Sequence, residues 1–213
     1  MKTKVKICGL TTEADIDAAI THGVDYIGLM FFKPSPRHLS IADGKRLAQH
    51  VAGRAKIVAV MVDAEDSLIE QIASEVQPDI YQLHGNETIE RVGQIRGLTG
   101  RETMKAIKVE TSEDAELALH YKNSVDYILF DAKAPKGSPL PGGNGLQFDW
   151  RVLETVMPHI QYMLSGGLTP GNVQEAIKRT EAWAVDVSSG VEAAPGHKDP
   201  VRIRAFLHAA KDI

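Results

Sequence analysis

The sequence predicts an α/β protein folded as a single (β/α)8 TIM barrel that spans residues 1–213. Short apolar runs typical of strands alternate with helix-like segments from one end of the chain to the other, and eight such pairs can be counted. A parallel sheet covered by outer helices requires this alternation. Eight pairs leave about 27 residues for each, close to the lower size of an eightfold barrel.

The predicted strands cover residues 5–8, 26–31, 57–62, 80–83, 104–109, 127–130, 160–164 and 182–187. Between them, apolar residues recur at helical spacing, most clearly within residues 16–20, 47–51, 68–76, 173–177 and 203–210. Each such helix would lay one apolar stripe on the barrel. The fourth and fifth pairs are the weakest, because the polar, Gly-rich stretch 93–101 blurs the boundary between helix and strand.

Two helix starts are marked by capping residues. Ser40 precedes an apolar residue and has Asp43 three positions later, as in a capping box. Thr169 precedes Pro170, a capping residue followed by the residue favoured at the first helical position. We therefore expect helices to begin directly after Ser40 and Thr169.

The overall charge and the cysteine content argue against several classes of protein. The net charge of -4 gives no bulk attraction to nucleic acid or to an anionic membrane. No apolar run approaches the roughly 18 residues of a membrane span. The single cysteine cannot form an intrachain disulfide, and the first residues lack the apolar core of a secretory signal, so we expect a cytoplasmic protein.

Two candidate proton-transfer groups stand at the outgoing ends of predicted strands. Cys8 ends the first strand, and Asp131 directly follows the sixth. If those strands close into a barrel, both side chains face one pocket, which suggests acid–base chemistry. A thiolate base needs a lowered pKa, which a helix N-terminus or a cation supplies, whereas an acid carboxyl pressed against apolar walls holds its proton more readily. The alternatives are a small buried structural cysteine and a carboxylate that caps a turn.

Arg37 lies in a proline-stiffened loop after the second strand, between Pro36 and His38. A guanidinium group held there can bind a substrate carboxylate at two points. The two prolines at positions 34 and 36 lower the entropy lost when this loop becomes ordered, which favours the functional interpretation. The alternative is a solvated surface arginine.

Three further loops suggest a binding site for an anion. The seventh and eighth pairs continue into Ser165-Gly166-Gly167 and Ser188-Ser189-Gly190, whose glycines and hydroxyls suit the phosphate cradle usual at these positions of eightfold barrels. The stretch 132–147 directly follows Asp131, is rich in Gly and Pro, and fits a mobile lid; the alternative is a surface excursion without function. The eight histidines are scattered, so no metal site is expected.

Motifs in this order resemble those of the phosphoribosylanthranilate isomerases, over nearly the whole chain. They are Lys6-Ile7-Cys8-Gly9-Leu10-Thr11, Ser35-Pro36-Arg37, Gln82-Leu83-His84-Gly85, Phe130-Asp131-Ala132-Lys133, Gly142-Gly143-Asn144-Gly145 with Phe148-Asp149-Trp150, Ser165-Gly166-Gly167-Leu168, Asp186-Val187-Ser188-Ser189-Gly190-Val191-Glu192 and Pro195-Gly196-His197-Lys198-Asp199. One departure is Asn144, where Thr or Ser is commoner in the family.

The resemblance implies an aldose–ketose isomerase of L-tryptophan biosynthesis, acting at the third step from chorismate. Such an enzyme converts N-(5-phosphoribosyl)anthranilate to 1-(2-carboxyphenylamino)-1-deoxyribulose 5-phosphate by an Amadori rearrangement. It is expected to need no cofactor and to act as a monomer or homodimer on a small phosphorylated substrate.

The resemblance also assigns roles to individual residues. Asp131 protonates the ring oxygen, Cys8 takes the C2 proton, and Arg37 holds the anthranilate carboxylate. His84 lines the anthranilate side, or alternatively bonds the backbone of its own turn. Asp186 orients groups inside the pocket, and the phosphate is held by residues of the two glycine loops, namely Gly166, Gly167, Ser188, Ser189 and Gly190.

Three other functions compete with this one. A pentose-phosphate epimerase would need metal-ligand histidines at strand ends, and an indole-glycerol-phosphate synthase would carry a catalytic lysine near the first strand end, where this chain has Cys8. A non-catalytic barrel could serve as a binding or scaffold subunit. Such a barrel would have little reason to keep both Cys8 and Asp131.

Overall fold

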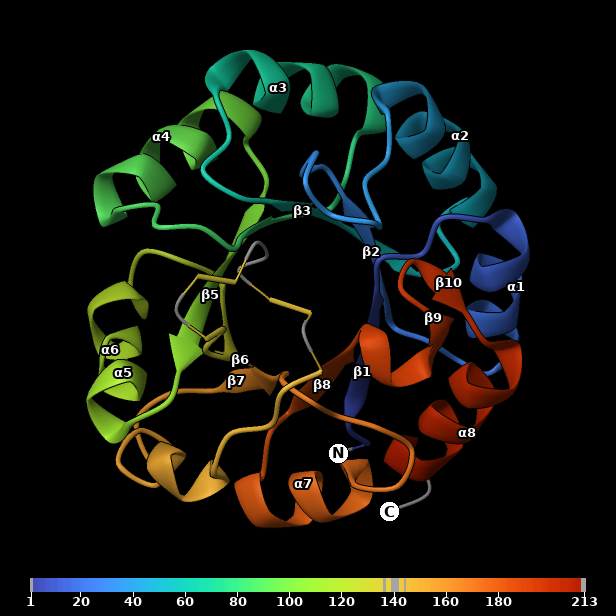
Figure 1. Cartoon of the computed structure of the whole chain (residues 1–213). Coiled ribbons are helices and arrows are strands. Elements are labelled where there is room, and N and C mark those ends of the chain that lie inside the picture. The colour runs from blue at the N-terminus through green and yellow to red at the C-terminus, as the bar shows by residue number, and fades with distance from the viewer. Residues whose placement is uncertain (1, 136, 139–141, 144, 212–213) are drawn as a thin grey trace.

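The eight strands close into one parallel barrel, which confirms the predicted fold class (Figure 1). The structure is a computed structural model, and it describes residues 2–135, 137–138, 142–143 and 145–211. Strands that are consecutive in the chain are adjacent in the sheet, and β8 pairs with β1 to close the barrel. In order, the strands are β1 (Lys4–Cys8), β2 (Tyr26–Met30), β3 (Lys56–Met61), β4 (Ile80–Leu83), β5 (Glu102–Val109), β6 (Tyr127–Ala132), β7 (Tyr162–Leu164) and β8 (Ala184–Val187).

The strand ends differ from the predicted ones where pairing overrides the apolar pattern. β6 continues beyond Phe130 because Asp131 and Ala132 pair with Lys108 and Val109 of β5. Asp131 is therefore part of the strand and does not follow it. Ala132, the first residue of the stretch 132–147 expected to form a lid, also belongs to β6. The predicted starts of β7 and β8, at residues 160 and 182, are each two residues too early.

Helices surround the barrel on its outside, as Figure 1 shows. They are α1 (Glu13–Thr21), α2 (Ile41–Val51), α3 (Asp66–Gln71), which continues as the π-helical turn η1 (Ile72–Val76), α4 (Ile89–Thr99), α5 (Ser112–Glu116), α6 (Ala118–Tyr121), the 3-10 turn η2 (Trp150–Leu153), α7 (Val173–Thr180) and α8 (Pro200–Lys211). A further 3-10 turn, η3 (Ser189–Val191), lies in the loop after β8. The blurred stretch 93–101 belongs mainly to α4, which ends at Gly100 in the left-handed conformation.

One of the two predicted helix caps is present. The Ser40 hydroxyl accepts a hydrogen bond from the Asp43 N–H at 3.1 Å, so α2 begins as expected. The prediction at Thr169 is wrong, because α7 begins at Val173. The Asn172 side chain accepts from the Thr169 N–H at 2.7 Å and donates to the Gly167 carbonyl at 3.0 Å. These two bonds hold residues 167–172 as a turn ahead of the helix.

Apolar side chains form two clusters. One lies between the strands and the surrounding helices and includes residues such as Ile7, Leu47 and Phe206. The other lies inside the barrel and includes Val58, Met104 and Leu129, with Cys8 as a member. Because side chains alternate along a strand, residues of β1 that face the barrel interior are separated by two positions.

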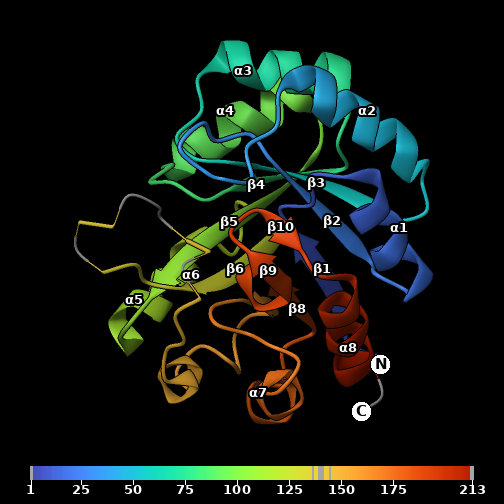
Figure 2. The ribbon, with the colours of Figure 1, turned by 45° about the vertical axis from the view of Figure 1, so that its right-hand side comes forward.

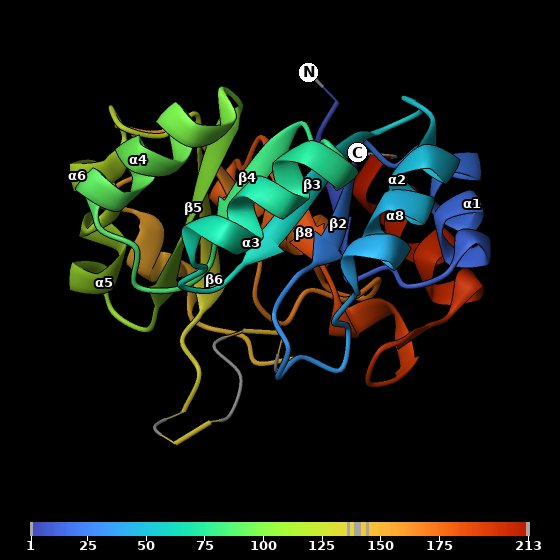
Figure 3. The same ribbon diagram turned by 90° about the horizontal axis from the view of Figure 1, so that it is seen from above.

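The loops that could form a site extend from one side of the barrel. Figures 2 and 3 show the loop after β2, the segment after β6 and the hairpin of β9 (Glu192–Ala194) and β10 (His197–Lys198) on the same side, with the N-terminus on the opposite side in Figure 3. These loops follow the carboxyl ends of the strands, where the active sites of such barrels lie. Among the described residues, no helix has the length and apolar character to cross a membrane.

Candidate active site

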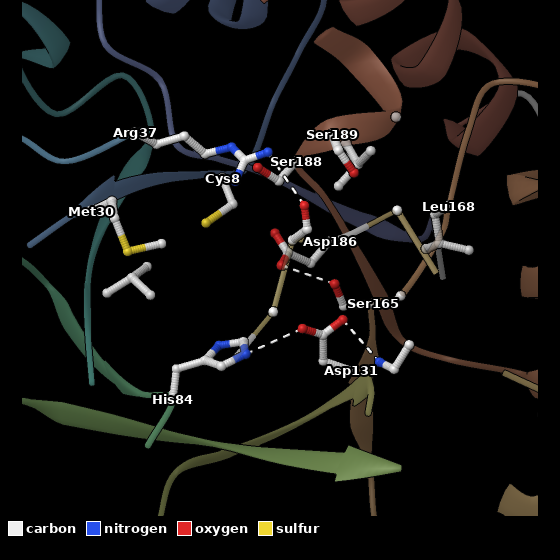
Figure 4. Close-up of a pocket in the computed structure, with 18 of the residues that line it drawn as sticks. Cys8, Met30, Arg37, His84, Asp131, Ser165, Leu168, Asp186, Ser188 and Ser189 are labelled. Carbon is white, nitrogen blue, oxygen red and sulfur yellow. Dashed lines mark hydrogen bonds and ion pairs between the residues drawn. The ribbon is translucent and has the colours of Figure 1, made fainter. Parts of the chain in front are cut away.

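A cavity of about 790 Å³, counted to its open mouth, lies among these loops (Figure 4). All ten residues expected at the site line it: Cys8, Arg37, His84, Asp131, Gly166, Gly167, Asp186, Ser188, Ser189 and Gly190. They come from β1, β6, β8 and the loops after β2, β4, β7 and β8. Barrel closure thus brings into one pocket residues that are up to 182 positions apart in the chain, from Cys8 to Gly190.

Cys8 is the last residue of β1 and is 5% exposed, and it is the only cysteine of the chain. Its neighbour on β2 is Gly28, and a Cβ added there would lie 2.9 Å from the Cys8 sulfur. A glycine at this position leaves room for the sulfur beside the backbone of β2. The thiol is therefore packed into the top of the barrel core and still reaches the cavity.

The surroundings of Cys8 are charged. Burial raises the pKa of the Cys8 thiol above its usual value, and the Lys6 and Lys198 ammonium groups oppose that effect while Asp186 adds to it. The expected cations are thus present, but in the protein without substrate the pKa of Cys8 is raised and not lowered. Burial outweighs the attraction of the cations.

Asp131 lies in polar surroundings, in contrast to the apolar walls expected for it. Its Oδ1 accepts a hydrogen bond from the N–H of Ala132 at 3.0 Å, and its Oδ2 lies 3.2 Å from Nε2 of His84. The latter is an ion-pair contact without the alignment of a hydrogen bond. On the other side of the imidazole, the Gln82 amide nitrogen lies 3.0 Å from Nδ1. The His84 ring therefore faces Asp131 and does not bond the backbone of its own turn.

Arg37 is 4% exposed and is already paired inside the protein. Its Nε and Nη2 donate to the two carboxylate oxygens of Glu192 at 2.7 and 2.8 Å. The opposite edge of the guanidinium lies against Gly143, whose carbonyl accepts from Nη2 at 3.4 Å. This end edge, formed by Nη1 and Nη2, faces Gly143, and Glu192 binds the guanidinium from the side.

Glu192 is shared between two cations. Lys198 of β10 donates to its Oε1 at 2.7 Å and to the backbone carbonyl of Ser188 at 3.0 Å. Burial opposes ionisation of the Glu192 carboxyl, but hydrogen bonds from Arg37 and the charge of Lys198 outweigh it and lower its pKa. The β9–β10 hairpin therefore connects Arg37 to the loop after β8 through buried ion pairs.

Asp186 stands in β8 between the two halves of the pocket. Its Oδ1 accepts from Nζ of Lys6 at 2.9 Å, and its Oδ2 accepts from the hydroxyl of Ser165 at 3.3 Å. Figure 4 shows Asp186 and Ser165 between Cys8 and Asp131. Asp186 thus bonds one side chain of β1 and one directly after β7, and it also lines the cavity.

The two glycine loops bring backbone groups close together. Gly166 and Gly167 have positive φ values of 93° and 63°, and their N–H groups donate to no acceptor within the described part of the chain. A Cβ on Gly190 would overlap the carbonyl oxygen of Leu168, so the loop after β8 packs tightly on the loop after β7. Free N–H groups on glycine loops can bind a phosphate group.

The segment expected to form a lid is described only in part. Residues 136, 139–141 and 144 lie outside the described residues, and with them the departure at Asn144. Gly142, Gly143, Gly145 and Leu146 line the cavity. A Cβ on Gly142 would come within 2.5 Å of Asp131 Oδ2 and 2.6 Å of His84 Nε2, so the segment lies directly over this pair.

Four residues that the sequence did not single out contact the predicted site residues: Gln82, which lines the cavity, and Lys6, Glu192 and Lys198 behind its wall. Each stands inside a motif that we quoted above, so a signal was present. Within the described ranges, no three His, Cys, Asp or Glu side chains gather in a way that could hold a metal ion.

Comparison with known proteins identifies the family. The sequence pattern of the N-(5'-phosphoribosyl)anthranilate (PRA) isomerase family matches residues 5–209. The chain belongs to this family. The N-(5'-phosphoribosyl)anthranilate isomerase of Rhizobium meliloti (strain 1021) is 49% identical over 211 residues, which are 99% of this chain and 98% of the relative.

Solved PRA isomerases share the fold along their full length. One, in complex with reduced 1-(o-carboxyphenylamino)-1-deoxyribulose 5-phosphate, is 35% identical with a TM-score of 0.87, covering 99% of this chain and 100% of that one. Another, described as monomers of the dimeric enzyme from Thermotoga maritima, is 37% identical with a TM-score of 0.86 and the same coverage. Membership of the PRA isomerase family therefore rests on sequence and on structure.

Proposed function

We propose that this chain converts N-(5-phosphoribosyl)anthranilate to 1-(2-carboxyphenylamino)-1-deoxyribulose 5-phosphate in L-tryptophan biosynthesis. One observation carries the proposal: Cys8 and Asp131, 123 residues apart in the chain, line the same cavity as Arg37 and the two glycine loops. A base, an acid and binding groups for two anions are thus available to one substrate molecule.

In the first half of the reaction, Asp131 transfers a proton to the ring oxygen of the furanose. The bond between C1 and this oxygen breaks, and the lone pair of the anthranilate nitrogen forms an iminium bond to C1. Asp131 is suited to this role because its carboxyl group lines the cavity opposite the backbone of Gly142. His84, 3.2 Å from the same carboxyl oxygen, supports its orientation.

In the second half, the Cys8 thiolate removes the proton from C2. The electron pair of that C–H bond forms a C1–C2 double bond, and the iminium nitrogen becomes an amine. The resulting enol gains a proton at C1 and loses the hydroxyl proton at C2, which leaves the ketone. Each acid–base step of this kind contributes about 10² to 10⁴-fold to the rate.

Binding of the two anionic ends would position the sugar between Cys8 and Asp131. We assign the anthranilate carboxylate to the end edge of Arg37, with His84 lining that side. We assign the phosphate group to the loops that carry Gly166, Gly167, Ser188, Ser189 and Gly190. The N–H groups of Gly166 and Gly167, which have no acceptor among the described residues, support the assignment. Fixing both ends reduces the entropy lost on the way to the transition state.

Turnover of freshly prepared phosphoribosylanthranilate, followed as loss of its fluorescence, tests the proposal. We expect turnover by the purified chain without added metal or cofactor, and turnover lower by about 10² to 10⁴-fold with a Cys8→Ala variant as control. Absence of turnover by the folded protein would contradict the proposal and would favour a non-catalytic barrel. Turnover of a pentose phosphate or formation of an indole product would favour one of the competing enzymes.

We further propose that residues 1–213 act as one domain, as a monomer or homodimer, in the cytoplasm. The match of the family pattern to residues 5–209 supports the single domain. The cytoplasm would keep the thiol of Cys8 reduced, which a base requires.

A further inference from the structure

Lys6 is a buried cation that the proposed reaction leaves without a role. It stands in β1 two residues before Cys8, so the two side chains lie on the same face of the strand, toward the barrel interior. The Lys6 side chain is 0% exposed. An ammonium group enclosed in this way is retained only where buried partners compensate for the lost water.

The partners of Lys6 hold it beneath Cys8. Lys6 and Asp186 are register partners in the pairing of β1 with β8, and Nζ lies 2.9 Å from Oδ1. The hydroxyl of Ser165 donates to the other oxygen of Asp186 at 3.3 Å, which keeps the carboxylate pointed toward Lys6. Cys8 stands two positions later on the same face of β1, and the charge of Lys6 lowers the pKa of its thiol.

On the basis of the isomerase activity proposed above, we propose that Lys6 is a positioning residue of this reaction. Its ammonium group, held by Asp186, stabilises the Cys8 thiolate that takes the C2 proton. Asp186 and Ser165 then form the support that keeps Lys6 in place. No covalent step is involved, and Lys6 stays protonated throughout.

The charges that face Cys8 come from four elements. Lys6 belongs to β1, Asp186 to β8 and Lys198 to β10, and Arg37 follows β2. Arg37 and Lys198 are both bound to Glu192, which offsets much of their charge. Lys6 is paired with Asp186 and lies on the same face of β1 as Cys8, and its charge affects the pKa of the Cys8 thiol more than the opposing charge of Asp186 does.

The state of Lys6 fits this role. Burial disfavours its ammonium group, but the charges of Asp186 and Cys8 outweigh burial and raise the pKa of Lys6 above the usual value for lysine. Lys6 therefore carries its positive charge throughout the range in which the enzyme would work. When the Cys8 thiolate forms, the Lys6 ammonium group is already in place and does not have to move to stabilise it.

Direct titration of the thiol tests the inference independently of turnover. Because Cys8 is the only cysteine, the ultraviolet absorbance of the thiolate, measured against pH and corrected with a Cys8→Ser variant, reports this group alone. We expect Lys6→Met to raise the titration midpoint by about one pH unit or more. We expect Lys6→Arg, which keeps the charge, to restore most of the shift.

Lys4→Met is the matched control. Lys4 lies on the same face of β1, two residues further from Cys8, and is paired with Asp25 at 2.8 Å at the exposed end of the strand. Its substitution removes a lysine from the same strand without touching the thiol. We expect the Cys8 midpoint of this variant to equal that of the unmodified chain.

A second variant covers the case that Lys6→Met does not fold, since it leaves Asp186 buried without its partner. Lys6→Met/Asp186→Asn removes both charges, and we still expect a midpoint above that of the unmodified chain, because Lys6 has the larger effect. An unchanged or lower midpoint in the folded Lys6 variants would overturn the inference. If the Lys6 variants raise the midpoint but the unmodified chain shows no turnover, the effect of Lys6 on the thiol is confirmed and the proposed function is contradicted.

Discussion

Arg37 illustrates how a buried cation is held in one orientation. Glu192 binds the Nε and Nη2 donors, so the orientation of the guanidinium is fixed, and its end edge lies against Gly143 in the cavity wall. A free arginine would lose side-chain entropy on binding, and an unpaired one would cost several kcal/mol to bury. The ion pair with Glu192 reduces both the entropy cost of binding and the cost of burying the charge.

Arg37→Ala is therefore expected to act mainly on substrate binding. The variant loses a handle used in both the ground state and the transition state, so KM should rise by about tenfold or more while kcat changes less. Glu192→Gln should shift KM in the same direction by a smaller factor, because Arg37 remains but is less well oriented. Steady-state kinetics measures both, and an unchanged KM in Arg37→Ala would refute the assignment.

Cys8→Ala and Asp131→Asn should each lower kcat by about 10² to 10⁴-fold, because each removes one proton-transfer group. Neither side chain belongs to the glycine loops, so the affinity for inorganic phosphate, measured by calorimetry, should stay nearly unchanged. A Cys8→Ala variant that keeps its activity would remove the base from the mechanism. Loss of phosphate binding in either variant would indicate a structural defect instead.

Among the secondary-structure elements, β6 shows how strand pairing positions the side chain of Asp131. Asp131 is polar and would be expected to follow the strand, yet its backbone pairs with Lys108 of β5. The sheet therefore extends to the carboxylate and holds it more rigidly than a loop would. Rigid elements keep catalytic groups within a narrow range of geometry.

Tight packing between the loops after β7 and β8 leads to a prediction for Gly190. A Cβ at Gly190 would overlap the carbonyl oxygen of Leu168 and lie 3.0 Å from its carbon, so Gly190→Ala must displace one loop. We expect the affinity for inorganic phosphate to fall by about tenfold or more, since a small displacement breaks several N–H contacts at once. Calorimetric titration measures this loss.

Gly171→Ala provides the control for this experiment. Gly171 lies in the turn before α7, and a Cβ there would meet only the Thr169 hydroxyl at 3.7 Å, an ordinary contact. We expect phosphate affinity to be unchanged. Equal affinities for the two variants would mean that the loop after β8 does not contribute to the phosphate site.

For the molecule as a whole, buried ion pairs predict how stability depends on pH. Burial opposes ionisation of Glu87, but the charge and hydrogen bond of Lys105, 2.8 Å away, outweigh it and lower the pKa of Glu87. The pKa of Glu192 is lowered in the same way by Arg37 and Lys198. In the unfolded chain both carboxyls would titrate near their usual pKa of about 4.3.

The free energy of unfolding should therefore fall as the solution is acidified. Because the folded carboxyls have lower pKa values, the unfolded chain binds more protons as the pH falls through about 4.3 and below, and stability is lost there. Above that range the contribution is complete. Urea unfolding at several pH values measures how steeply the free energy of unfolding changes with pH. A Lys105→Met/Glu87→Gln variant should show a weaker dependence on pH. A pH dependence that this double variant leaves unchanged would contradict the role given to Glu87.

Much of the fold follows from local patterns in the chain. The strand-like runs predict all eight strands of the barrel, because strand and helix periodicity depend only on neighbouring residues. Glycine loops after the seventh and eighth strands, and Cys8 at the end of the first, are likewise visible from spacing alone. Helix starts were less certain, since Asn172 and not Thr169 governs the turn before α7.

The partners of the site residues depend on the closed barrel. Lys6 and Asp186 are 180 positions apart, and Arg37 and Glu192 are 155 apart, yet each pair is buried at ion-pair distance. Strand register and closure determine which of many charged residues meet, and neither leaves a mark in a local pattern. Composition and periodicity therefore specify which groups the chain offers at its strand ends. The register of the closed barrel decides which of them form ion pairs, because a hydrogen-bonded ion pair requires the two charged atoms to lie within about 3 Å of each other.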